Sequence, residues 1–119
     1  MRIAIPSKGD RGLRDEVSDV FARAAYFTII DLQNGEVENI KVEENTASSL
    51  KHGTGPIVAK MLKEKGVEAV LTGELGPGAK TLLELSEIRA IRVAPGVKVK
   101  EAIVRARESF TNPLKQVQV

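Results

Sequence analysis

AVLTGELGPGAKT, residues 69–81, is the stretch that decides the fold of this chain. The apolar run Ala69–Thr72 is typical of a buried strand, and Ala79–Leu85 has the apolar spacing of a helix. A glycine-rich turn joins them, so the stretch predicts one strand–loop–helix unit of an α/β protein. A helix N-terminus presents unpaired N–H groups and a partial positive charge, so this turn is also a candidate site for an anionic ligand.

The N-terminal part of the chain predicts three strands. Arg2–Pro6 is typical of a short buried strand, and Tyr26–Asp31 is rich in aromatic and β-branched residues. Asn34-Gly35 then gives a strong hairpin signal. Glu38–Val42 alternates polar and apolar residues, as a half-exposed edge strand does.

Helical spacing appears in the segments between and after the strands. Val17–Ala22 is predicted to form one helical turn. A longer helix begins with Thr54 as its N-cap and Pro56 in its first turn, and it ends at Gly66. A final amphipathic helix runs from Val99 to Phe110, because its apolar residues recur at intervals of three and four.

Two further strands, Val67–Thr72 and Ile88–Val93, alternate with these helices, which predicts a parallel sheet covered on both faces. We expect a three-layer α/β/α fold with a five-stranded mixed sheet of order 3-2-1-4-5, in which strand 2 is antiparallel to the rest. A single domain would occupy residues 1–110, and residues 111–119 would form a loosely ordered tail. Four strand C-termini would share one sheet edge, where ligands bind in open α/β sheets. The loops expected there are Ser7–Glu16, Glu43–Gly55, Gly73–Gly78 and Ala94–Val97.

Composition excludes several classes of protein. The 119 residues include no cysteine and one histidine, so disulfides, thiolate nucleophiles and multi-histidine metal sites within one chain are excluded. The formal net charge is +2 with both signs interspersed, which gives no footprint for a nucleic-acid partner. No apolar run is long enough to span a membrane, so we expect a cytoplasmic protein without a membrane partner. Abundant lysine and glutamate fit a protein from a hot environment.

The glycine-rich turn nearly matches a nucleotide-binding P-loop. That motif requires a lysine directly after its last glycine, but here Ala79 separates Gly78 from Lys80. One additional helical residue rotates the following side chains by about 100°, so Lys80 would point away from a phosphate. We therefore expect no bound nucleotide. The turn is either a tight connection without a ligand or a site that holds an anion through its backbone N–H groups.

His52 and Arg23 are candidate ligand-binding residues, and each has a structural alternative. His52 lies directly before a predicted helix and is either an exposed surface residue or a ligand. A metal there would need carboxylates, donors on the ligand or a second chain to complete its coordination. Arg23 either binds an anion, caps a helix C-terminus or pairs with a surface carboxylate. The sequence contains no convincing catalytic triad or carboxylate cluster, so we expect no enzyme activity.

Three motifs follow one another along the chain. They are Ser18-x-x-Phe21-Ala22-Arg23-Ala24-x-x-Phe27, Glu44-Asn45 … His52-Gly53-x-Gly55, and Gly73-x-x-Gly76-Pro77-x-Ala79. With the opening Ile3-Ala4-Ile5-Pro6, their order and spacing resemble the dinitrogenase iron–molybdenum cofactor biosynthesis family over residues 1–108. The resemblance implies a ribonuclease H-like fold without nuclease activity.

The resemblance also implies a function. Relatives that work in nitrogenase assembly bind or carry iron–sulfur or iron–molybdenum cofactor precursors, which implies a non-catalytic carrier of such a metallocluster with a donor or acceptor protein as partner. The alternative is a regulatory or protein-interaction module for a small anionic metabolite or a partner protein. Its edge strand, Glu38–Val42, would pair with another chain, and a homodimer is one such assembly. The implied metal ligand is His52, and the implied cofactor-binding residues are Ser7, Arg23, His52, Gly53, Gly55, Gly73 and Gly76.

Overall fold

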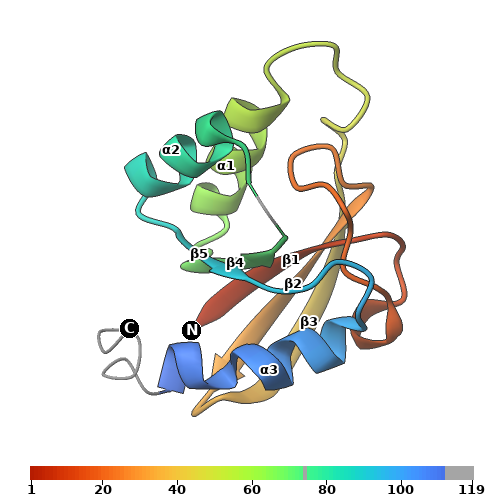
Figure 1. Cartoon of the computed structure of the whole chain (residues 1–119), viewed down its shortest axis with the longest axis vertical. Coiled ribbons are helices and arrows are strands. Elements are labelled where there is room, and N and C mark those ends of the chain that lie inside the picture. The colour runs from red at the N-terminus through yellow and green to blue at the C-terminus, as the bar shows by residue number, and fades with distance from the viewer. Residues whose placement is uncertain (74, 112–119) are drawn as a thin grey trace.

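A five-stranded sheet between two layers of helices forms the protein (Figure 1). The computed structural model describes residues 1–73 and 75–111, so residues 112–119 of the predicted tail lie outside the described residues. The strands are β1 (Arg2–Ser7), β2 (Tyr26–Gln33), β3 (Glu36–Glu44), β4 (Ala69–Thr72) and β5 (Arg89–Arg92). The helices are α1 (Thr54–Glu64), α2 (Pro77–Leu85), α3 (Val99–Thr111) and a short 3₁₀ helix, η1 (Gly12–Arg14).

The sheet has the strand order β3-β2-β1-β4-β5. β2 is antiparallel to β1 and β3, whereas β4 is parallel to both β1 and β5. The predicted strand order and the reversed direction of strand 2 are therefore confirmed. α1 and α2 cover one face of the sheet and α3 covers the other, which confirms the three layers (Figure 1). The C-terminal ends of β1, β3, β4 and β5 consequently share one edge.

The hairpin between β2 and β3 has the turn that its sequence predicts. Asn34 has φ 54° and Gly35 has φ 81°, the left-handed values that a tight type I′ turn needs. Asparagine and glycine adopt these values at a lower cost than other residues. The turn places β3 at the edge of the sheet, as expected, and most of its residues are exposed.

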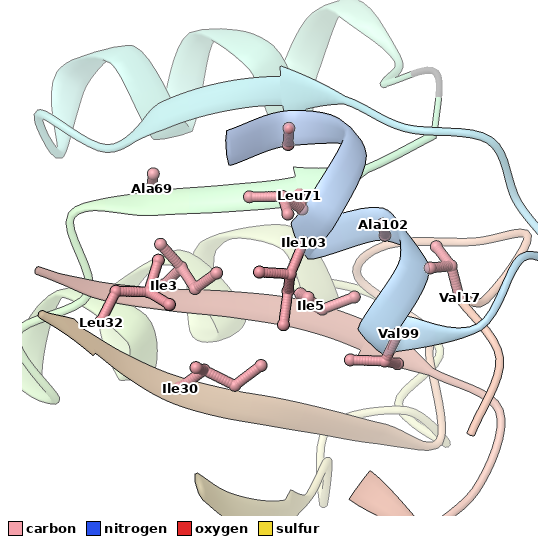
Figure 2. Packing of buried hydrophobic residues seen from close by; sticks show 11 residues of the cluster. Ile3, Ile5, Val17, Ile30, Leu32, Ala69, Leu71, Val99, Ala102 and Ile103 are labelled. Carbon is pink, nitrogen blue, oxygen red and sulfur yellow. The ribbon is translucent and has the colours of Figure 1, made fainter. Parts of the chain in front are cut away.

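Each face of the sheet carries its own hydrophobic core. Alternate residues of β1 point to opposite faces, so Ile3 and Ile5 join the core under α3 while Ala4 joins the core under α1 and α2. Figure 2 shows the first core, in which side chains of the sheet meet the buried face of α3. The buried α3 residues are Val99, Ala102, Ile103 and Ala106, at the predicted helical spacing.

The prediction of a helical turn at Val17–Ala22 is wrong. Val17 is extended and forms a β-bridge with Ser7, and its N–H donates to the carbonyl of Val97 at 2.8 Å. These bonds to distant segments outweigh the weak local preference of the segment for helix. The short helix of this region is η1, which lies inside the predicted loop Ser7–Glu16. None of the described helices has the length and apolar character needed to span a membrane.

Candidate functional site

The candidate site lies where α1 and α2 begin, at the edge formed by the strand C-termini (Figure 1). The two helices are neighbours on the same face, and they pack closely at Gly55. A Cβ on Gly55 would lie 3.3 Å from Cδ1 of Leu82, so a larger residue here would press on the Leu82 side chain. The N-termini of the two helices therefore lie side by side at one edge of the sheet. Each N-terminus has unpaired N–H groups and a partial positive charge.

The start of α1 depends on a left-handed glycine. Gly53 has φ 77° and is the N-cap of the helix, so the prediction of Thr54 as the N-cap is wrong. Glycine adopts this conformation without steric cost, and this allows the helix to start one residue earlier than predicted. Thr54 is the first helical residue. Its Oγ1 is buried and has no hydrogen-bond partner among the described residues.

Arg23 fixes the loop that carries His52. Its guanidinium donates hydrogen bonds to the carbonyl oxygens of Ser48, Leu50 and Lys51 at 3.2, 2.6 and 3.1 Å. These acceptors belong to a loop and not to a helix C-terminus or a carboxylate, so neither predicted structural alternative for Arg23 describes them. His52 directly follows the segment that Arg23 holds, and its side chain is exposed.

Asn45 also holds this loop in place through hydrogen bonds. Its buried side chain donates to the carbonyl oxygens of Ala22 and Ala24 at 2.8 and 2.9 Å and accepts from the N–H of Ala47 at 3.2 Å. The segment that carries Arg23 is therefore tied to the segment that leads to His52 at two points. The sequence marked Asn45 only as part of a motif. A buried amide bonded to carbonyls more than twenty residues away leaves no local pattern that could reveal its role.

The remaining predicted residues lie in different surroundings. Ser7 is buried, and its hydroxyl shares a hydrogen bond of 2.9 Å with that of Thr28. Gly73 is also buried, and a Cβ there would lie only 2.8 Å from Cγ of Pro95. Gly76 is the exposed N-cap of α2, and apart from its chain neighbours no described residue has an atom within 4 Å of its Cβ position. The predicted residues that the structure exposes are Arg23, His52, Gly53 and Gly76.

The start of α2 differs from a P-loop in its bonding as well as in its spacing. The hydroxyl of Thr81 donates to the carbonyl oxygen of Pro77 at 3.0 Å, within the helix. In a P-loop the corresponding hydroxyl binds magnesium. Lys80 is exposed, and its N–H donates to the carbonyl of Gly76. The Thr81 hydroxyl is thus bonded within the helix.

The described residues contain no group of three or more His, Cys, Asp or Glu side chains that could hold a metal ion. A metal at this edge would therefore take most of its ligands from outside the described side chains. The prediction that carboxylates, donors on the ligand or a second chain would complete any coordination around His52 stays a prediction.

Comparison with known proteins decides the family. A family model described as dinitrogenase iron-molybdenum cofactor matches residues 1–109. The chain belongs to this family. A curated relative, an uncharacterized protein of Methanocaldococcus jannaschii, is 33% identical over 84 residues, which is 71% of this chain and 67% of the relative.

Solved structures of similar proteins agree with the fold over 92% of this chain. The apo form of the orange protein from Desulfovibrio gigas has a TM-score of 0.77 at 31% identity, and 88% of it is covered. A NifB-like protein from Thermotoga has a TM-score of 0.71 at 40% identity, with 89% covered. The family resemblance inferred from the motifs is confirmed.

The dinitrogenase iron-molybdenum cofactor family motifs of this chain meet in space. Arg23 of the first motif holds the loop of the second motif, which contains His52. Gly55, at the end of the second motif, contacts α2, the helix that begins within the third. Parts of all three motifs therefore lie close together at one edge of the sheet.

Proposed function

We propose that this protein is a non-catalytic carrier of an anionic metallocluster, or of its precursor, of the iron–sulfur or iron–molybdenum type. The observation that carries the proposal is the opening of two helix N-termini beside the exposed His52, in a member of the dinitrogenase iron-molybdenum cofactor family. Backbone N–H groups and helix dipoles stabilise negative charge at such a position. A cargo with net negative charge suits this edge better than a free cation.

The donor set limits how the cargo would be held. The sequence has no cysteine, so a cluster that depends on several protein thiolates does not fit this chain. A cluster that brings its own sulfide shell fits, because it needs hydrogen bonds, charge complementarity and at most one side-chain ligand. His52 would supply that ligand, and Gly53 and Gly76 would allow the cargo to approach the backbone closely.

Arg23 serves this carrier indirectly in our proposal. Its three hydrogen bonds keep the loop before His52 in place, so the histidine is presented at the start of α1. We assign no catalytic step to the site, because His52 has no nucleophile or carboxylate bonded to it among the described residues. Loading and release would instead occur by exchange with a donor or acceptor protein in the cytoplasm.

Anaerobic reconstitution tests the proposal. The protein is incubated with ferrous iron and sulfide, or with isolated iron–molybdenum cofactor, and is then desalted and measured by visible absorption and metal analysis. We expect a coloured complex that remains with the protein, and His52→Ala should weaken it by about tenfold or more. Lys63→Ala, an exposed change in the last turn of α1, is the matched control and should leave binding unchanged.

Two results would count against this function. If neither cluster source gives a complex, the carrier proposal is wrong. If His52→Ala binds cargo as well as the native chain, the cargo is held elsewhere and the ligand assignment fails.

A further inference from the structure

A hollow of about 430 Å³ is lined by residues of η1 and of the beginning of α3. α3 covers the face of the sheet opposite α1 and α2 (Figure 1). The hollow is separated from the proposed cargo site by the sheet itself. We name it the cationic hollow, because four of its lining side chains are basic. Its lining residues are Arg11, Leu13, Arg14, Lys98 and Lys100.

Most of the positive charge in the cationic hollow is not neutralised. Arg11 lies 3.6 Å from the carboxylate of Asp15. The side chains of Arg14, Lys98 and Lys100 are exposed and form no ion pair or hydrogen bond within the part of the chain that the structure describes. No carboxylate is among the lining residues. The whole chain carries a net charge of only +2, so this is a local concentration of positive charge.

Two nearby acidic groups, Glu16 and Glu101, are already engaged. Glu16 lies 3.2 Å from Lys8, and Glu101, in the first turn of α3, lies 2.7 Å from Arg105. Their charges are balanced by cations outside the cationic hollow. The hollow therefore retains an attraction for an external anion.

The backbone beneath the cationic hollow is held in place by Asp15. Its buried carboxylate accepts hydrogen bonds from the N–H groups of Arg11 and Glu16 at 3.0 and 2.8 Å. Burial raises the pKa of Asp15, but these bonds and the Arg11 guanidinium lower it further than burial raises it, so the carboxylate stays ionised. The carbonyl of Asp15 also accepts from the N–H of Val99 at 2.8 Å, which ties the loop to α3.

We propose that the cationic hollow is a docking surface for an acidic, carboxylate-rich segment of a partner protein. The hollow is open, and its unpaired cations stand on long side chains that no neighbour holds in one geometry. A single small anion binds best to fixed, converging donors, whereas a run of carboxylates can pair with several mobile cations at once. Leu13 adds an apolar contact for the segment. The inference rests on this surface alone and not on the carrier function proposed above.

Fluorescence anisotropy with a labelled octaglutamate peptide tests the docking surface. We expect the full-length protein to bind the peptide at low salt and to release it as salt increases, because the charges are exposed. The double variant K98E/K100E should weaken binding by about tenfold or more. It should remain folded, because glutamate is favourable near a helix N-terminus. The control K60E/K63E makes the same charge change on α1, away from the cationic hollow, and should alter binding less than about twofold.

Each other outcome would overturn the proposal. If the native chain does not bind the peptide, or if both double variants weaken it equally, the cationic hollow is not a carboxylate-docking surface. A single-stranded RNA oligomer of equal charge serves as competitor. If it binds more tightly than the peptide and K98E/K100E abolishes its binding, the surface recognises phosphates instead. Cluster loading of K98E/K100E should remain native, which separates this test from that of the carrier function.

Discussion

Replacing Arg23 by alanine should loosen the loop before His52 without disturbing the sheet. The change removes three hydrogen bonds from the guanidinium to the carbonyls of Ser48, Leu50 and Lys51. Arg23 is exposed, so each bond is expected to contribute about 0.5 kcal/mol, the low end for a protein hydrogen bond, and the total is about 1.5 kcal/mol. Cargo affinity should fall as well, although Arg23 is not expected to touch the cargo.

Urea denaturation and amide hydrogen exchange measure this effect. The N–H groups of Ser48 and Leu50 donate to carbonyls within the loop at 3.1 Å each, and we expect them to exchange faster in Arg23→Ala. Arg23→Lys keeps the charge but not the planar fork, so it should lose about half as much stability. Arg14→Ala removes an exposed arginine without hydrogen-bonded partners among the described side chains and should stay within about 0.5 kcal/mol of the native chain. If Arg23→Ala changes neither the free energy of unfolding nor the hydrogen exchange of these N–H groups, Arg23 does not hold the loop in place.

Three further changes test the surroundings of the site. Gly73→Ala should cost about 1–3 kcal/mol in thermal unfolding, because its Cβ would lie 2.8 Å from Cγ of Pro95. Gly76→Ala, which meets open space, should cost less than about 1 kcal/mol, and equal losses would contradict the packing argument. Thr54→Val should raise stability by up to about 1 kcal/mol, because it removes a buried hydroxyl without a partner among the described residues, and a clear loss would mean that the hydroxyl is bonded. The lowered pKa of Asp15 contributes stability that is present above the ordinary value of 3.8 and is lost as pH falls through the lower folded value. Urea midpoints of Asp15→Asn should therefore vary less below about pH 4 than those of the native chain, and parallel curves would argue against this coupling.

Local sequence patterns correctly predict most of the fold. The Asn34-Gly35 turn specified the hairpin, and the alternation of strands with helices specified the parallel part of the sheet, because both depend on short-range conformational preferences. The prediction failed at Val17, where a β-bridge to Ser7 and a hydrogen bond to Val97 outweigh a weak helical preference. It also misplaced the N-cap of α1, because the left-handed conformation of Gly53 shifts the helix start.

Residue types and their spacing along the chain are enough to predict the fold class, the family and the edge of the sheet where the family motifs meet. The lack of cysteine likewise means that these 119 residues supply no thiolate ligand. The contacts that each residue makes at that edge become visible only in the folded molecule. Arg23 clasps a loop, Ser7 bonds inside the sheet and Gly73 makes room for Pro95. These roles depend on contacts between segments far apart in the chain, and local residue preferences carry no record of such contacts. The same holds for the cationic hollow, where cations from two distant segments meet only after folding.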